Sequence, residues 1–266
     1  MGRRRVEPEA PQGPDDVIQI KSGREIEVMA EGGRILAATL ELLRRSVKPG
    51  MSTGDLDRIA GDFVASHAGA TAAFKGLYGF PGYACISVNE EIVHGIPSPK
   101  RVLKDGDIVS LDFGVKYEGY FTDAAITVPV GTISPDDQRL LATCEQSLRA
   151  GIAAAIPGNH VGDIGAAIAA VVKAAGYTTA DDLVGHGVGT GPHEDPQVPN
   201  FGKPKRGTRL VPGLTIAIEP MVNAGVSATR TLADNWTVVT RDGKRSAHFE
   251  HTVAITTAGN RVLTAA

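Results

Sequence analysis

Two aspartates lie in consecutive apolar, strand-forming runs of this sequence. Asp112 lies in residues 108–116 and Asp123 lies in 120–130, so a hairpin that turns near 117–119 would bring the two acids opposite, or nearly opposite, each other. Opposed residues in an antiparallel pair have Cβ atoms about 4.5–5.5 Å apart. Two like charges at that range are unfavourable unless a proton or cation lies between them. One aspartate alone is typical of a turn, but a facing pair favours a metal site.

Glu219 and Glu250 lie in two later apolar segments, 214–221 and 246–254. A glutamate on a half-exposed strand can simply face solvent, so neither residue alone indicates a ligand. A buried carboxylate, however, is costly unless it is paired. Pro220 also ends the hydrogen bonding of its strand directly beside Glu219.

His186 and His193 flank the glycine-rich segment 187–192, where the backbone can approach a ligand or another chain closely. Their spacing differs from the HExxH pattern of a zincin helix, which excludes that class of zinc site. His94 lies in segment 89–97. A hydrogen-bonded structural role is expected for the remaining histidines: His67, His160 and His248.

Four carboxylates with one or two histidines fit a pair of divalent ions better than a single zinc ion, because acids can bridge two ions. Such a pair activates water and stabilises a tetrahedral intermediate, which is the chemistry of hydrolysis. His251, next to Glu250, is expected to support that carboxylate weakly by a hydrogen bond.

The elements that would position these residues alternate between helices and strands. Ser22 and Glu25 have the spacing of a capping box and predict a helix to about residue 47. Further helices are predicted at 53–67, 134–156 and 162–175. Strands are predicted at 85–89, 108–116, 120–130, 183–190, 214–222, 236–241 and 247–256, with a loop at 71–83.

An internal repeat connects the two ends of this arrangement. The pattern Pro-Gly-x-x-x-Gly-Asp at 49–55 recurs at 157–163, and Leu-x-x-Gly followed by an acid at 103–112 recurs at 210–219. Both pairs have nearly the same offset. One copy is too small to bury its own apolar face, so the two copies are expected to pack together about a pseudo-two-fold axis. The acids that end the second motif then lie on either side of a central cleft.

The overall composition indicates neither a nucleic-acid-binding protein nor a membrane protein. With 266 residues, 42% hydrophobic and a net charge of −3, it has no nucleic-acid motif and no excess of basic charge. No run reaches the roughly 18 apolar residues of a membrane span. Cys85 and Cys144 lie in apolar surroundings and are expected to be reduced, buried thiols, which favours the cytoplasm.

Residues 1–16 are rich in proline, glycine and charge, so we expect a disordered leader there. Residues 17–266 are expected to form one catalytic domain. Its two halves would span about 23–130 and 134–256.

Five segments resemble those of type I methionine aminopeptidases, in the same order and with similar spacing, from about Ile20 to the C-terminus. They are NEEIVHGIP (89–97), DIVSLDFGVKYEGYFTDAA (107–125), GHGVGTGPHEDP (185–196), AIEPM (217–221) and SAHFEHT (246–252). The resemblance implies the α+β pita-bread fold, in which two pseudosymmetric halves form a central antiparallel sheet backed by helices. This fold agrees with the internal repeat.

The resemblance also implies roles for individual residues. Asp123 and Glu250 would bridge two divalent ions (Co, Mn, Fe or Zn), His94 and His193 would contact the substrate, and Glu219 would also move a proton. The implied metal ligands are Asp112, Asp123, His186, Glu219 and Glu250. The implied substrates are nascent polypeptides that start with methionine and have a small second residue. A monomeric enzyme would meet them at the ribosome.

An apolar pocket would select methionine, and the family-like positions are Phe80, Cys85 and Trp236. The sequence departs from the family pattern nearby. Pro192 stands where an aromatic residue is common, and Phe74 and Leu77 stand where cysteine and tyrosine are frequent. These departures concern the walls of the pocket and leave the metal ligands unchanged.

Three other functions are compatible with single features. An Xaa-Pro peptidase of the same fold would suit Asp112-Phe-Gly, but segment 89–97 favours the methionine enzyme, and the additional N-terminal domain of such peptidases is not expected here. A binding module that has lost its metals is disfavoured because every implied ligand is present. A kinase is excluded because no glycine-rich phosphate loop accompanies Asp112-Phe-Gly.

Overall fold

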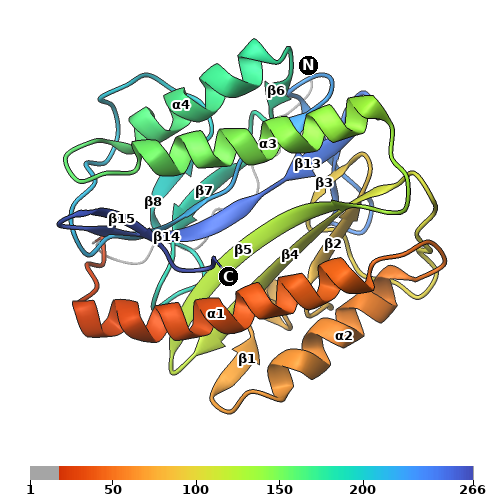
Figure 1. Cartoon of the computed structure of the whole chain (residues 1–266), viewed down its shortest axis with the longest axis horizontal. Coiled ribbons are helices and arrows are strands. Elements are labelled where there is room, and N and C mark those ends of the chain that lie inside the picture. The colour runs from red at the N-terminus through yellow and green to blue at the C-terminus, as the bar shows by residue number, and fades with distance from the viewer. Residues whose placement is uncertain (1–17, 266) are drawn as a thin grey trace.

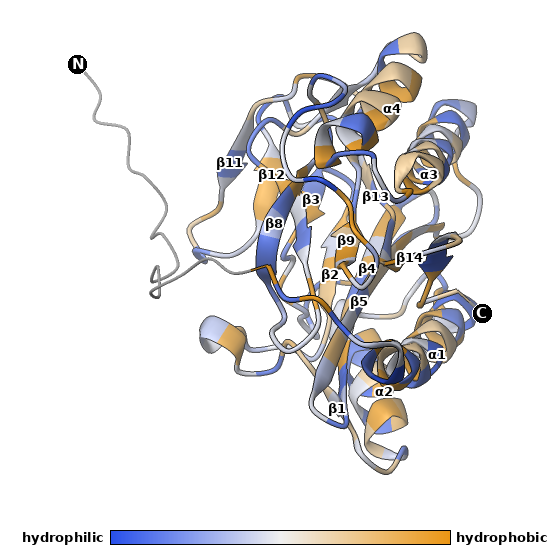
Figure 2. Ribbon diagram, turned by 90° about the vertical axis from the view of Figure 1, so that its left-hand side faces the viewer, coloured by the Kyte–Doolittle hydropathy of each residue, from blue (hydrophilic) through white to orange (hydrophobic). Residues whose placement is uncertain are grey.

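Four helices cover one side of an antiparallel sheet in the computed structural model, which describes residues 18–265 (Figures 1 and 2). The first two helices pack on one half of the sheet and the last two on the other half. The helices are α1 (Gly23–Ser46), α2 (Thr53–Ala65), α3 (Pro135–Ala154) and α4 (Val161–Ala174). The leader predicted at 1–16 lies outside the described residues.

The helices begin where local sequence chemistry predicts. Ser22 caps α1, since its hydroxyl accepts from the backbone N–H of Glu25 and the Glu25 carboxylate accepts from the N–H of Ser22. This reciprocal pair satisfies two N–H groups that the first helical turn leaves free. Ser134 caps α3 without this reciprocal pair: its hydroxyl accepts from the N–H of Asp137, and Pro135 stands in the first turn. All four predicted helices are confirmed.

The main sheet has nine strands, all paired antiparallel, in the order β1-β4-β5-β14-β9-β7-β8, with β2 paired to β4 and β15 paired to β14. Its strands are β1 (Ala70–Ala72), β2 (Cys85–Val88), β4 (Ile108–Tyr117), β5 (Tyr120–Pro129), β7 (Val184–Gly187), β8 (Glu194–Pro199), β9 (Thr215–Ile218), β14 (Glu250–Thr256) and β15 (Gly259–Val262).

Two three-stranded sheets extend this framework. One contains β6 (Thr178–Thr179), β10 (Met221–Asn223) and β13 (Ser246–His248), and the other contains β3 (Glu91–Val93), β11 (Thr229–Thr231) and β12 (Val238–Thr240). A single 3₁₀ turn, Leu77–Gly79, interrupts the loop before β2.

The repeated sequence motifs adopt the same local structure. The N–H of Gly50 donates to the carbonyl of Leu103 at 2.9 Å, and the N–H of Gly158 donates to that of Leu210 at 2.9 Å. Gly50 and Gly158 have φ values of 90° and 94°, in the left-handed region that favours glycine. The pseudosymmetry inferred from the sequence is thus present in the backbone.

Two large apolar clusters lie between the sheet and the helices, one for each helix pair. The first contains Leu36, Leu56 and Phe113, and the second contains Leu148 and Ile164. Cys85 and Cys144 are both buried and free, as the sequence predicts. Within the described range, no helix is both long and apolar enough to cross a bilayer.

The strand predicted at 247–256 is divided in two. β13 pairs with β10 in a small sheet, whereas β14 pairs with β5 and β9 in the main sheet. Phe249 lies at the break, and its N–H donates to the carbonyl of Pro220 at 3.4 Å. One continuous β-forming run therefore serves two sheets, a division that tertiary pairing imposes.

Candidate metal centre

The hairpin β4–β5 brings Asp112 and Asp123 to the same face of the sheet. It closes through a two-residue turn at 118–119 in which both residues have positive φ, the geometry of a type I′ turn. The register pairs Asp112 with Ala125 and Gly114 with Asp123. The two acids are therefore diagonal neighbours, offset by one pleat, and are nearly rather than directly opposed.

A single row of residues crosses four strands on this face. Cys85 in β2 is paired with Asp112 in β4, Asp112 with Ala125 in β5, and Ala125 with Glu250 in β14. Neighbouring strands lie about 4.8 Å apart, so the backbones at Asp112 and Glu250 are separated by roughly 10 Å. The methyl group of Ala125 leaves the space between the two carboxylates open.

Two groups of ligand atoms converge beside this row. One atom each from Asp123, His186 and Glu250 lies within 4.8 Å of the others, and the same holds for Glu219, His248 and Glu250. Nε2 of His186 is 3.4 Å from Oε1 of Glu219, which connects the two groups. Glu250 belongs to both. The arrangement offers two adjacent cation positions that share one carboxylate.

The imidazole of His186 has its free nitrogen directed into the cluster. Its Nδ1 lies 2.8 Å from the carbonyl oxygen of Gly187, which can only accept, so Nδ1 carries the hydrogen. Nε2 is then left with a lone pair, the form that binds a metal. Burial, and secondly the charge of nearby His193, lowers the pKa of His186 to about 3 and keeps the ring neutral.

The carboxylates are buried without enough partners. Among the residues that the structure describes, Oδ1 of Asp112, Oδ1 of Asp123 and Oε1 of Glu250 have no hydrogen-bond donor. Burial raises the pKa of Asp123 to about 7 and those of Asp112, Glu219 and Glu250 well above their usual range, and neighbouring acids add to the last three. Orphaned, mutually repelling acids of this kind fit divalent cations.

His94 and His193 lie at the exposed rim of this cluster. The rings of His193 and His186 are 4.5 Å apart between centroids, in an edge-to-face arrangement. His94 directly follows β3 with a φ of 59°, and its ring lies 6.4 Å from that of Trp236. Both rim histidines are exposed, unlike the carboxylates, so they are accessible to a molecule that enters the site.

The three predicted pocket residues belong to one apolar cluster. Phe80 and Cys85 are buried in it and Trp236 packs against it, with the Phe80 and Trp236 rings 5.1 Å apart between centroids. Phe74 and Leu77, which depart from the family pattern, belong to the same cluster. Because Cys85 is paired with Asp112, this cluster adjoins the acids.

The structure places two histidines differently from their predicted roles. His248 is buried, and its Nε2 lies 3.8 Å from carboxylate oxygens of both Glu219 and Glu250. Neither of its ring nitrogens has a hydrogen-bond partner within residues 18–265, so the predicted hydrogen-bonded structural role is wrong. The spacing of His248 from Glu250 gave no reliable signal, because the chain passes from one sheet to another at Phe249 between them.

His251 does not support Glu250 as predicted, because its Nδ1 shares a hydrogen bond of 2.9 Å with the hydroxyl of Thr264. His67 keeps its predicted hydrogen-bonded role, since its Nδ1 lies 2.9 Å from the carbonyl oxygen of Phe63. His160 occupies the N-terminal cap position of α4 through its backbone, and its Nδ1 has no hydrogen-bond partner among the described residues, so a hydrogen-bonded role of its ring is not confirmed.

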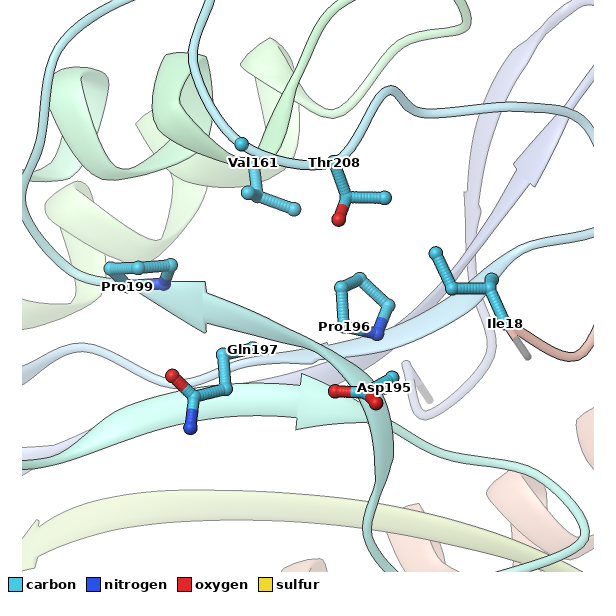
Figure 3. Close-up of a pocket in the computed structure, with 8 residues that line it drawn as sticks. Ile18, Val161, Asp195, Pro196, Gln197, Pro199 and Thr208 are labelled. Carbon is cyan, nitrogen blue, oxygen red and sulfur yellow. The ribbon is translucent and has the colours of Figure 1, made fainter. Parts of the chain in front are cut away.

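A separate pocket of about 450 Å³ lies on the outer side of β8 (Figure 3). The side chains of Val161 and Thr208 point across it toward Pro196. The pocket is lined by Ile18, Val161, Asp195, Pro196, Gln197, Pro199, Gly207 and Thr208. None of these residues belongs to the acidic cluster, so this pocket is distinct from the candidate metal centre.

Comparison with known proteins defines the class of this fold and site. The model of metallopeptidase family M24 matches residues 27–257, and the chain belongs to this family. Membership implies that the chain binds divalent metal ions, in agreement with the acidic cluster.

Individual relatives are similar over nearly the whole chain. Methionine aminopeptidase 1 of Bacillus subtilis (strain 168) is 53% identical over 93% of this chain and 99% of its own length. The crystal structure of methionine aminopeptidase from Thermotoga maritima has a TM-score of 0.92 at 41% identity, covering 94% of this chain and all of that one. The Xaa-Pro dipeptidase from Bacillus anthracis has a TM-score of 0.76 at 23% identity, covering 93% of this chain and 62% of that one, which shows the pita-bread fold alone.

Proposed function

We propose that this chain hydrolyses the first peptide bond of polypeptides that begin with methionine followed by a small residue. The observation that carries the proposal is the cross-strand pairing of Cys85 with Asp112, which puts an apolar cluster beside the acidic one. A methionine side chain among Phe80, Cys85 and Trp236 would bring its own carbonyl to the acids. The relatives named methionine aminopeptidase support this substrate.

We assign the metal ligands to Asp112, Asp123, His186, Glu219 and Glu250. Asp123 and Glu250 would be shared between two ions, as the family resemblance implies. Glu250 belongs to both groups of converging atoms, whereas Asp123 belongs to one. Co, Mn, Fe and Zn all suit carboxylate and imidazole ligands. Two such ions, when bound, supply an activated water and stabilise the charge that develops on the substrate carbonyl.

The protein side chains would orient the peptide and move its protons. His193, exposed at the rim beside His186, donates a hydrogen bond to the carbonyl oxygen as negative charge develops there. His94, beside Trp236, holds the peptide next to the apolar cluster. Glu219, whose carboxylate lies beside His186 in the cluster, would take a proton from the attacking water and pass it to the leaving amine.

The substrates in the cell would be nascent polypeptides, met in the cytoplasm at the ribosome by a monomeric enzyme. The two free, buried cysteines are compatible with that compartment.

The test is an assay of the purified chain on matched peptides after its metal content has been measured. Met-Ala-Ser should release methionine, whereas Leu-Ala-Ser and Ala-Pro-Ser should be cleaved far more slowly. EDTA should abolish the activity, and Mn²⁺ or Co²⁺ should restore it. Preference for Ala-Pro-Ser would indicate an Xaa-Pro peptidase, and a metal-loaded chain that cleaves none of these peptides would contradict the proposal.

A further inference from the structure

Lys21 and Glu194 form a buried ion pair between segments that lie far apart in the sequence. Only 2% of the Lys21 side chain and 9% of the Glu194 side chain are exposed. Lysine is almost never buried to this extent without a partner. Because the loss of hydration offsets much of the attraction in a buried pair, stability alone is a weak reason for keeping one.

The Glu194 carboxylate accepts hydrogen bonds from within the turn that connects β7 and β8. Its Oε1 accepts from the N–H of Gly191 at 2.8 Å and from the hydroxyl of Thr190 at 2.8 Å. Its Oε2 accepts from Nζ of Lys21. Both carboxylate oxygens of Glu194 therefore have partners, and its negative charge lies inside the turn.

Lys21 anchors this turn to the body of the protein. Its N–H donates to the carbonyl of Gly213 at 2.8 Å, and the next residue, Ser22, caps α1. The lysine side chain also lies against the turn backbone, since a Cβ at Gly189 would come within 2.1 Å of Cε of Lys21. Only glycine at position 189 leaves enough room for the Lys21 side chain.

The two ends of the turn carry His186 and His193. His193 directly precedes Glu194, so displacement of the carboxylate displaces His193 with it. We propose that Lys21 and Glu194 are positioning residues that fix His193 at its place against His186, where the ring centroids are 4.5 Å apart. The catalytic meaning of this inference rests on the proposed function, whereas the positioning itself does not.

The experiment compares Lys21→Met and Glu194→Gln with the wild-type chain on Met-Ala-Ser at saturating Mn²⁺. A misplacement of about 1 Å can cost about 10²-fold in rate, so kcat should fall by roughly 10- to 100-fold while KM and metal content stay unchanged. In a His193→Ala background, Lys21→Met should produce no further fall. Lys21→Arg should restore part of the rate.

Arg261→Met is the matched control, because Arg261 also ties α1 to a distant strand, through an exposed ion pair with Glu27. It should leave kcat unchanged. A second readout that does not require activity is the NMR signal of the His193 imidazole, which should shift in Lys21→Met and stay in place in Arg261→Met.

A folded Lys21→Met chain with wild-type kcat, or one whose kcat falls equally in the His193→Ala background, would overturn the inference. Loss of bound metal would overturn it too. If Lys21→Met does not fold, Thr190→Val replaces it, because this change removes only a hydroxyl, which contacts the side chains of Glu194 and Gln19. A wild-type chain without any activity would contradict the proposed function, and the His193 signal would still decide the positioning claim.

Discussion

Cys85 and Asp112 lie directly opposite each other on β2 and β4, and therefore on the same face of the sheet. Burial, and secondly the charge of Asp112, raises the pKa of the Cys85 thiol well above its usual range, so the sulfur remains neutral. The neutral thiol of Cys85 therefore provides an apolar surface directly beside the carboxylate of Asp112. Under the proposed function, the side chain and the carbonyl of a single substrate residue would be recognised on adjacent strands.

Trp236→Ala should weaken selection of methionine. A change of this kind in an apolar pocket is worth about 1–3 kcal/mol, so kcat/KM for Met-Ala-Ser should fall roughly 10- to 100-fold with metal content unchanged. Steady-state kinetics and elemental analysis provide the two measurements. Phe201→Ala, at an exposed aromatic residue, is the control and should keep wild-type kinetics. An unchanged kcat/KM in Trp236→Ala would remove Trp236 from the pocket.

Ala125→Leu should fill the space between Asp112 and Glu250 and prevent metal binding. Ala125 is buried and paired with both acids, so a larger side chain there projects into the proposed cation positions. Calorimetric titration with Mn²⁺ should show no saturable binding for Ala125→Leu. Ala125→Ser, which is nearly the same size, should bind as the wild type does. Full metal occupancy in a folded Ala125→Leu chain would place the ions elsewhere.

His94→Ala should retain its metals and lose most of its turnover. The ring lies at the rim beside Trp236 and belongs to neither group of converging ligand atoms. Loss of one hydrogen-bond donor at a reacting centre typically lowers kcat by about 10²- to 10³-fold. Elemental analysis of the variant, performed with the rate assay, should show wild-type metal content. A chain that loses its metals would make His94 a ligand.

His248→Ala should weaken metal binding by about 10- to 100-fold, the usual effect of removing a residue that orients metal-binding carboxylates. His248 contacts both Glu219 and Glu250 at 3.8 Å and has no other partner in the described chain. His248→Gln preserves a donor of similar reach and should bind metal nearly as tightly as the wild type. Equal affinity for all three chains, measured with Mn²⁺ by calorimetry, would show that His248 is a bystander.

Metal-free protein should become less stable as pH rises above about 6.5. Asp123 ionises near pH 3.8 in the unfolded chain but at about 7 in the folded one, so the folded state keeps a proton that the unfolded state has released. The free energy of unfolding then falls with increasing pH, by about 1.4 kcal/mol per pH unit for each such proton.

The buried histidines change the free energy of unfolding in the opposite direction, but only at lower pH. The pKa values of His186 and His248 fall from 6.5 in the unfolded chain to about 3, so they add stability as pH rises to about 6.5 and contribute nothing further above it. Above pH 6.5 only the carboxylates still lower the free energy of unfolding, and the contribution of Asp123 is complete near pH 7. Calorimetry should show a falling Tm in EDTA, a smaller slope in Asp123→Asn and no fall with saturating Mn²⁺; a flat metal-free profile would contradict this.

The elements that local chemistry determines could be predicted from the sequence. The capping box of Ser22 and the paired glycines Gly50 and Gly158 act within a few residues, and these predictions are confirmed. Of the five predicted metal ligands, Asp123, His186, Glu219 and Glu250 lie in the two groups of converging atoms and Asp112 lies in neither. That these residues hold metal ions stays a prediction.

The remaining features depend on tertiary pairing. A shift of one residue in the turn changes every partner in a hairpin, so the diagonal offset of Asp112 and Asp123 could not be determined from spacing alone. His248, and not His251 as predicted, lies beside Glu250, because the chain leaves one sheet and enters another at Phe249. That exchange is decided by strands distant in sequence, such as β10.

The donors of the acidic cluster come from both repeats: Asp112 and Asp123 from the first, and His186, Glu219 and Glu250 from the second. An isolated first repeat would offer oxygen atoms alone, and an isolated second repeat would lack the hairpin that faces it. The group of Glu219, His248 and Glu250 lies wholly within the second repeat, whereas the group of Asp123, His186 and Glu250 is complete only when the two repeats have docked. Binding of a cation to this second group during refolding would therefore report the docking step.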